Sequence, residues 1–265
     1  MAAIEPMEQF LIHKVVDFPL IPVPVLGHID LSITNSVLFM LIAAGLLCLF
    51  FVAAAKRELV PGRMQAVAEM LYGMVDNVLT GGIIGDRGRP FLPIVFTLFM
   101  LIAILNLLGL TPGGFTVTSQ LAITGTLAVM TFLIVLAVGF ARNGLGFFKL
   151  FWPAGMHPAM SAFLMIIELI SFLIRPFTLA LRLFGNMLGG HVVVYIFAAF
   201  VVNLAIFGLN GFGLNTLGLL GSGLSFAMVL ALTALDLVIA IIQAFVWAAL
   251  TCVYLNEVVN LDHGH

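Results

Sequence analysis

An apolar run from about Ala159 to Phe207 constrains the fold of this chain more than any other stretch. As one helix it would be about 70 Å long at 1.5 Å per residue, more than twice the roughly 30 Å hydrocarbon core of a bilayer. A second run, Gly223 to Asn256, would reach about 50 Å by the same arithmetic. Either each run breaks, or the two lie steeply tilted as a hairpin joined by the Gly/Asn-rich segment 208–222. No polar turn interrupts either run, and Pro176 can kink a membrane helix without ending it, so we predict the tilted hairpin.

The rest of the composition fits a membrane protein. Hydrophobic residues make up 63% and charged residues 8% of the 265 residues, against about 25% charged in soluble domains. A soluble fold of this size has no means of burying that much apolar surface. The net charge of -2 comes without a basic block, which argues against a nucleic-acid partner. The absence of a GxxxxGK[ST] loop argues against direct nucleotide binding.

Three shorter uncharged segments each have the length of a single crossing. They are Ile33 to Ala55, Phe91 to Leu110 and Gln120 to Ala141. Residues 1–32, with several acidic groups and prolines, are expected to stay outside the membrane. We therefore predict an all-α polytopic membrane protein with about five membrane segments, organised as one membrane domain over 1–265: an extramembrane segment at 1–32, three spans within 33–141 and the hairpin at 159–256.

Basic residues predict the orientation of these segments. Residues 56–90 hold half of the ten basic residues, and the segment 142–157 holds Arg142 and Lys149. By the positive-inside rule both segments are cytoplasmic, which places the N-terminus outside and the C-terminus inside. Apolar residues at three- and four-residue steps also predict an amphipathic helix at 61–80. It either lies on the cytoplasmic membrane surface or packs on its neighbours as an ordinary amphipathic helix.

The hairpin carries an unusual set of charges. Arg182 lies deep in the first apolar run, where an arginine costs several kcal/mol unless water, a carboxylate or another protein surface receives it. Glu168 and Arg175 precede it at steps of seven, which drift only about 20° per step around a helix, so the three share one face. Thr178 and Asn186 lie four residues either side of Arg182 on the same stripe. The small residues Gly185 and Gly189 beside it predict a close-packing surface.

A second polar group lies away from this face. His191 follows Arg182 by nine residues, hence on roughly the opposite side of an ideal helix. Asp236 and Gln243 are seven apart on the last run. A histidine and a carboxylate are the groups that a proton relay near neutral pH needs. This arrangement suits two separate aqueous routes with an obligate cation between them.

Simpler structural interpretations of these residues remain open. Glu168 with Arg175 is equally well explained as a structural ion pair. His191 taken alone is better explained as a neutral core histidine that donates to a backbone carbonyl. The presence of Asp236 on the only other overlong run favours the relay.

Several of these residues belong to motifs through which the chain resembles subunit a of the F-type ATP synthase membrane sector. The specific matches are Leu181-Arg182-Leu183-Phe184-Gly185-Asn186, Gln243-Ala244-Phe245-Val246 and Leu250-Thr251-Cys252-Val253-Tyr254-Leu255. Weaker support comes from Pro61-Gly62-Arg63-Met64-Gln65 with Glu69, and from Asn106-Leu107-Leu108-Gly109-Leu110-Thr111-Pro112. The resemblance covers nearly the whole length.

The resemblance implies a role for each candidate residue. Arg182 matches the essential arginine, which faces the ring of c subunits and attracts each ring carboxylate as it passes. His191 and Asp236 match positions of the two offset half-channels, and they are exchanged relative to the best-known enterobacterial pattern. Glu168 also matches a half-channel position, and the remaining candidates for the proton path are Thr178, Asn186, Gln243 and Arg175.

The same resemblance implies the partners and the location. The partners are the c-subunit ring, the b subunits of the peripheral stalk, the rest of the F-type ATP synthase and the lipid bilayer. The chain is expected to be a multi-pass protein of the bacterial inner membrane with no catalytic site, cofactor or metal of its own. Alternatives are a sodium-coupled version of the same subunit and a secondary transporter. The first three crossings, however, lack the repeated Gly/Pro-broken helices that transporters usually show.

Overall fold

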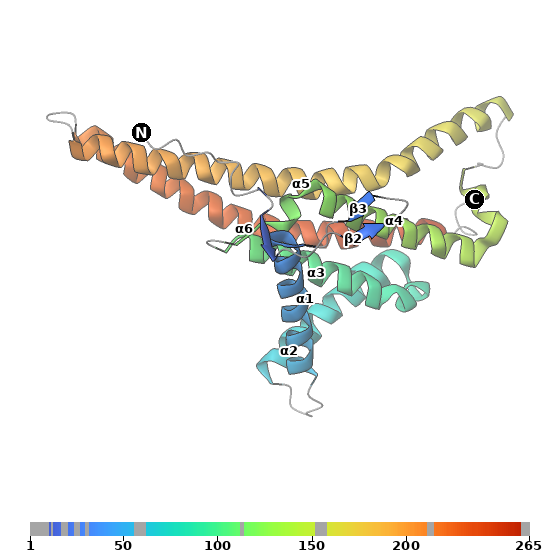
Figure 1. The fold of residues 1–265 in the computed structure, drawn as a ribbon. Coiled ribbons are helices and arrows are strands. Elements are labelled where there is room, and N and C mark those ends of the chain that lie inside the picture. The colour runs from blue at the N-terminus through green and yellow to red at the C-terminus, as the bar shows by residue number, and fades with distance from the viewer. Residues whose placement is uncertain are drawn as a thin grey trace. The chain divides into compact units, whose positions relative to one another are not determined.

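The computed structural model describes residues 11, 13–16, 21–23, 27–29, 32–55, 62–111, 114–151, 158–210 and 215–260 (Figure 1). Most of the predicted segment 1–32, the basic pair Lys56 and Arg57, and part of the predicted hairpin loop lie outside the described residues. The chain forms two compact units. The first unit comprises Met1–Ala43, Leu105–Gln120 and Phe184–Ile241, and the second unit comprises Ala44–Ile104, Leu121–Leu183 and Ile242–His265.

Five helices in the described part of the chain are long and apolar enough to cross a membrane. They are α1 (Asn35–Ala54), α3 (Leu92–Gly109), α4 (Leu121–Asn143), α5 (Pro158–Asn210) and α6 (Asn215–Val259). This confirms the predicted all-α polytopic membrane protein. Helix α5 runs through Pro176 without a break, as the uninterrupted apolar pattern predicts. The tilt of α5 and α6 in a bilayer and the single-domain organisation stay predictions.

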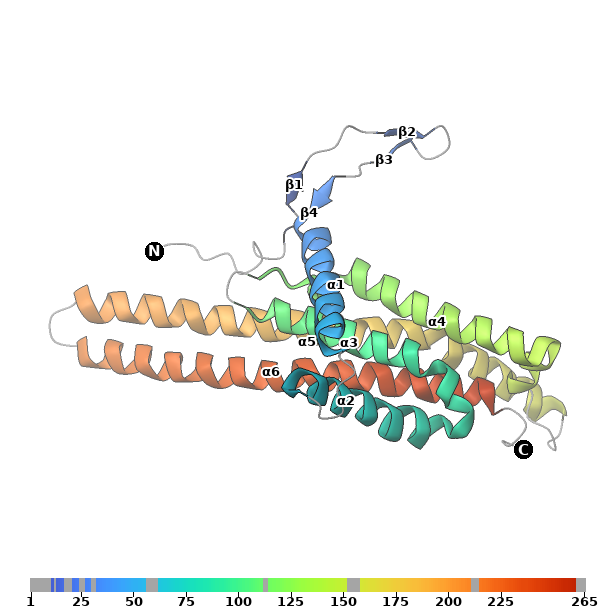
Figure 2. The same ribbon diagram turned by 90° about the horizontal axis from the view of Figure 1, so that it is seen from below.

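The described strands are confined to the approach to α1. β1 (Lys14–Val16) pairs with β4 (Ile33–Thr34), and β2 (Ile21–Val23) pairs with β3 (Gly27–Ile29), both antiparallel. Figure 2 shows the two short ladders leading into the start of α1. Two-stranded ladders leave every strand an edge strand, where a proline such as Pro22 is tolerated.

The amphipathic segment in the second unit begins as α2 (Arg63–Met74) and continues as a π-helical segment, η2 (Val75–Ile84), and a short 3₁₀ helix, η3 (Asp86–Phe91). The backbone N–H of Gly85 donates to the Thr80 carbonyl at 3.2 Å, a bond that spans five residues as in a π-helix. Tyr72 packs edge-on against Phe96 with ring centroids 5.4 Å apart. This contact with α3 supports packing of the amphipathic helix on its neighbours.

Within the first unit, the C-terminal part of α5 and the N-terminal part of α6 lie side by side and antiparallel (Figures 1 and 2). Ser222 donates to the Val201 carbonyl at 3.0 Å. A Cβ on Gly218 would lie 2.9 Å from the Gly208 Cα atom, so glycine is needed for this approach. The predicted loop at 208–222 is therefore wrong over most of its length. Its small residues allow close helix packing, α5 extends to Asn210, and α6 begins at Asn215.

Within the second unit, α4, the N-terminal part of α5 and the C-terminal part of α6 pack together. Phe132 of α4 and Phe172 of α5 lie 5.0 Å apart between ring centroids. The Asn143 amide donates to the Val258 carbonyl at 2.7 Å and ties the end of α4 to the end of α6. These contacts fix the part of α5 that carries Arg175 and Arg182.

Candidate functional site

Arg182 projects from the second unit as an exposed charge. It makes no hydrogen bond or ion pair with any residue that the structure describes, whereas its helix neighbour Leu183 is buried. Leu179, three residues earlier, is buried as well. Helix α5 is thus anchored by its leucines while the guanidinium faces outward. This is the arrangement expected of a membrane arginine that is received by something outside the described chain.

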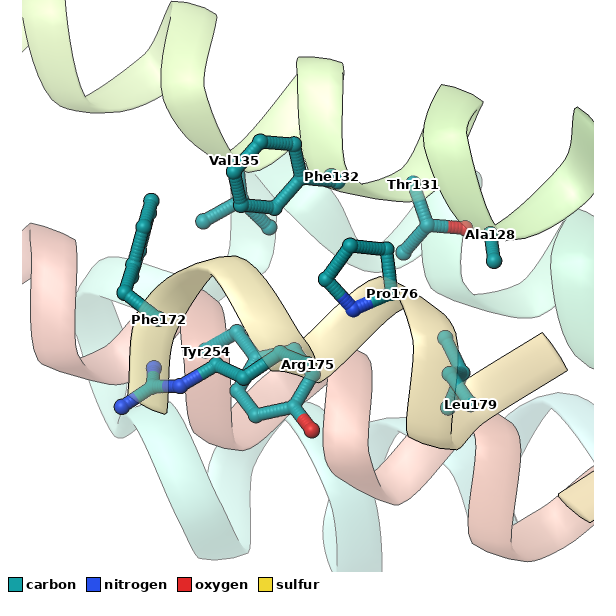
Figure 3. Close-up of a pocket in the computed structure, with 9 residues that line it drawn as sticks. All are labelled: Ala128, Thr131, Phe132, Val135, Phe172, Arg175, Pro176, Leu179 and Tyr254. Carbon is teal, nitrogen blue, oxygen red and sulfur yellow. The ribbon is translucent and has the colours of Figure 1, made fainter. Parts of the chain in front are cut away.

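Arg175 has the opposite character, because its charge is satisfied inside the second unit. Its guanidinium pairs with Glu257 of α6 and, at 3.5 Å, with Glu168 of α5, while its side chain is only 14% exposed. The guanidinium carbon also lies 5.3 Å from the centre of the Phe172 ring and 4.9 Å from that of Tyr254. Figure 3 shows the guanidinium beside these two rings. The ion pair that the spacing of Glu168 and Arg175 allows is present, and Arg175 clamps α5 to α6.

Glu257 was missed at the sequence level. The predicted apolar run ends at Asn256, one residue before it, whereas α6 continues to Val259. The sequence signal for Glu257 is a carboxylate directly after the last apolar run, where it can pair with Arg175.

The space next to Arg175 is nearly filled. The cavity there measures about 10 Å³, room for about one water molecule, and its walls come from α4, α5 and α6 (Figure 3). Apolar side chains such as Phe132, Val135 and Leu179 form most of the lining. Glu168, by contrast, keeps 43% of its side chain exposed while it pairs with Arg175. Of the two groups, Glu168 is the one accessible to water from outside.

Three further predicted residues show less specific surroundings. The Thr178 hydroxyl donates to the Arg175 carbonyl at 2.9 Å, which is a bond within its own helix. Asn186 and Gln243 are half-buried, and neither makes a hydrogen bond with a residue that the structure describes. Their roles near Arg182 stay predictions.

His191 and Asp236, the predicted relay pair, line one cavity in the first unit. The cavity measures about 250 Å³, room for several water molecules. Tyr195 and Thr233 add polar groups to its wall, and the end of α3 contributes Gly109, Leu110 and Thr111. The structure thus brings the histidine of α5 and the carboxylate of α6 to the wall of one cavity with room for water.

The packing of Asp236 depends on a glycine. A Cβ on Gly190 would lie 2.5 Å from Oδ1 of Asp236, so the carboxylate rests directly on the backbone of α5 beside His191. Gly185 and Gly189, which predict a close-packing surface, have no atom within 4 Å of such a Cβ among the described residues. The glycine that makes the close contact is Gly190, which directly follows the Gly185–Gly189 pair. The consecutive pair Gly189-Gly190 before His191 is the signal that sequence reasoning overlooked.

Two polar residues without an assigned role also belong to the first unit. Thr116, which is buried, lies with its hydroxyl oxygen 3.1 Å from Nε2 of His191. Asn106, fully buried near the end of α3, donates to the Ala240 carbonyl of α6 at 3.0 Å. Asn106 belongs to one of the motifs that carry the resemblance, but the resemblance implies no role for it. Thr116 lies in a short uncharged linker without a recognisable motif.

These features define a polytopic helical membrane protein with two polar sites, each built where a part of α5 packs on a part of α6. The chain belongs to the ATP synthase A chain family, whose sequence model matches residues 37–256. It is 44% identical over 261 residues to ATP synthase subunit a of Mesorhizobium japonicum, with 98% of each chain covered. It is 45% identical over 261 residues to the same subunit of Hyphomonas neptunium, again with 98% of each covered. Identity to the Rhizobium meliloti subunit is 44% over 262 residues, covering 98% of this chain and 99% of the relative.

Proposed function

We propose that this chain is the proton-translocating stator subunit of an F-type ATP synthase. The observation that carries the proposal is the state of Arg182. This arginine lies exposed on an unbroken membrane helix, and it forms no ion pair with a described residue. The relatives are named ATP synthase subunit a. In a rotary ATP synthase, an exposed membrane cation can act on ionisable groups of a neighbouring subunit. The partner surface is the ring of c subunits, whose carboxylates Arg182 attracts one at a time.

Protons reach the ring from the outer side through a half-channel at His191 and Asp236. A cavity of about 250 Å³ with both groups in its wall supports this assignment, since water can occupy it. A proton delivered there neutralises a ring carboxylate. The neutral carboxyl then enters lipid, where the charged form would cost several kcal/mol.

Release takes place at the second half-channel, near Glu168, on the cytoplasmic side. The partly exposed carboxylate of Glu168 supports this assignment. Arg182 lies between the two routes and stays charged at any working pH, so it favours the ionised ring carboxylate and cannot itself relay protons. Each charge that moves down the potential supplies about 2.3 kcal/mol per 100 mV. Because Arg182 prevents protons from passing directly from one half-channel to the other, they cross the membrane only as the ring rotates.

The remaining assignments follow from the same proposal. The chain holds no catalytic site for ATP, which is made elsewhere in the complex. The b subunits of the peripheral stalk hold it against the rotating ring. It resides in a bacterial inner membrane as one membrane domain, with its N-terminus outside and its C-terminus in the cytoplasm.

The proposal is tested on the complete ATP synthase that contains this chain, purified and reconstituted into liposomes. ATP hydrolysis is expected to acidify the vesicle interior in buffer without added sodium, as followed by quenching of an acridine dye, and a protonophore should abolish the signal. Transport that appears only with added sodium would favour the sodium-coupled alternative. An assembled complex that hydrolyses ATP without moving either ion would overturn the proposal.

Glu168→Gln is expected to slow proton passage several-fold without changing uptake on the outer side. The amide keeps the size of the side chain but is neither an acid nor a base at working pH. Arg175 retains its pairing with Glu257, so the clamp between α5 and α6 survives. The measurement is the rate of proton flux through reconstituted complexes at equal amounts of assembled protein.

Glu257→Gln is the matched control, because it removes the other carboxylate from the same guanidinium. If Glu168 serves the proton path, only its own replacement slows the flux. Equal effects of the two substitutions would return Glu168 to a purely structural role.

A further inference from the structure

The hydroxyl of Thr116 joins the predicted relay histidine to the end of helix α3. Its oxygen lies 3.1 Å from Nε2 of His191 and 3.4 Å from the carbonyl oxygen of Gly109. The side chain is buried, so its hydrogen bonding is decided by these protein groups. Thr116, Gly109 and His191 all belong to the first unit.

The two contacts together favour one arrangement of the protons. A carbonyl oxygen only accepts, and a threonine hydroxyl has one hydrogen to donate. Gly109 is the last residue of α3, where a helix leaves its carbonyls without partners inside the helix. When the Thr116 hydrogen satisfies that carbonyl, the same oxygen can only accept from His191. Nε2 must then carry a hydrogen.

The position of Thr116 is itself tightly held. Its carbonyl accepts from both the backbone N–H of Ser119, at 3.1 Å, and the Ser119 hydroxyl, at 2.6 Å. A Cβ on Gly109 would lie 2.9 Å from Cγ2 of Thr116, so the threonine rests against the bare backbone of the helix end. These contacts leave the hydroxyl little freedom to turn away from the imidazole.

We infer that Thr116 is a positioning residue, which holds the neutral His191 imidazole as its Nε2-protonated tautomer so that Nδ1 takes up the relayed proton. This inference rests on the proposed function of His191 in the outer half-channel. Histidine chemistry supports this role for Thr116, because the hydrogen bond at one ring nitrogen sets the protonation of the other. His191, Asp236 and Tyr195 are the titratable groups that line the cavity within the described residues.

The test compares Thr116→Val with Thr118→Val in the reconstituted complex. Thr118 lies two residues away in the 3₁₀ helix η4 (Val117–Ser119), which begins directly after Thr116. It is fully buried, and its hydroxyl makes no hydrogen bond with a described group. Both substitutions remove one hydroxyl and keep the shape. We expect Thr116→Val to lower proton flux about two- to tenfold, the effect of losing one hydrogen bond, while Thr118→Val changes it little. Thr116→Ser should restore the wild-type flux.

A histidine background separates positioning from general damage. In His191→Gln complexes, adding Thr116→Val should cause no further loss, because there is no imidazole left to orient. Flux is divided by the amount of assembled complex, so poor assembly does not imitate the effect. Gly109→Ala offers a second route to the same result, since it displaces the intact hydroxyl, and Thr116→Ser should not share its defect.

The outcomes also separate this inference from the proposed function. If His191→Gln leaves the flux unchanged, the outer relay itself is wrong. If His191→Gln lowers the flux but Thr116→Val behaves like Thr118→Val, or lowers the flux equally in the presence and absence of His191, only the positioning role of Thr116 is overturned.

Discussion

Arg182→Ala is expected to abolish coupled ATP synthesis while leaving the complex assembled. Without the guanidinium, a ring carboxylate that passes this point is no longer held in its ionised form, and protons can cross directly from one half-channel to the other. Assembly should survive because the side chain is exposed and makes no hydrogen bond or ion pair with a described residue. The measurement is ATP synthesis driven by an imposed proton gradient, at equal amounts of assembled complex.

Two substitutions serve as controls for Arg182→Ala. Arg182→Lys keeps a positive charge but replaces the planar guanidinium with a group that loses its proton more readily in an apolar site, so we expect it to support little coupled synthesis. Arg175→Ala removes a membrane arginine of the opposite kind, one that is clamped by Glu257 and Glu168. It should lower the amount of assembled complex, because two carboxylates lose their partner. If the Arg182→Ala complex retained coupled ATP synthesis, the proposed role of Arg182 would be wrong.

The hairpin illustrates how far sequence reasoning reaches in this fold. The lengths of the apolar runs and the absence of a polar turn predict α5 and α6 as continuous helices, including the passage through Pro176. The same reasoning failed at 208–222, where glycines and asparagines resemble a loop. In a membrane protein small residues serve equally well to bring two helix backbones together, and sequence alone does not say which use applies. The contact between Gly208 and Gly218 decides it.

The candidate site divides in the same way. Charges in apolar segments are conspicuous because they are costly, so Arg182, His191 and Asp236 emerge from the sequence alone. Thr116 and Gly190 do not, since neither residue type is unusual in a membrane helix or a linker. Their importance comes from tertiary contacts, namely a hydroxyl 3.1 Å from Nε2 of His191 and a backbone pressed against Asp236.

The second large effect is expected from exchanging the relay pair. His191→Glu alone places two carboxylates in the wall of one cavity, and Asp236→His alone places two imidazoles there. Like groups in the wall of one cavity oppose each other's ionisation, so each single variant should lose most of its proton flux. The double variant, His191→Glu with Asp236→His, restores one acid and one base to the same cavity. It should therefore conduct better than either single variant.

Complete recovery in the double variant is not expected, for two structural reasons. An imidazole at position 236 needs more room than the carboxylate that now packs against Gly190, and a glutamate at position 191 loses the ring nitrogen that contacts Thr116. The order of the four fluxes is thus the informative measurement: wild type first, then the double variant, then both single variants. If each single variant conducts as well as wild type, His191 and Asp236 are not the relay. If the double variant is worse than both, each residue is needed at its own position, and complementarity of acid and base does not explain the pair.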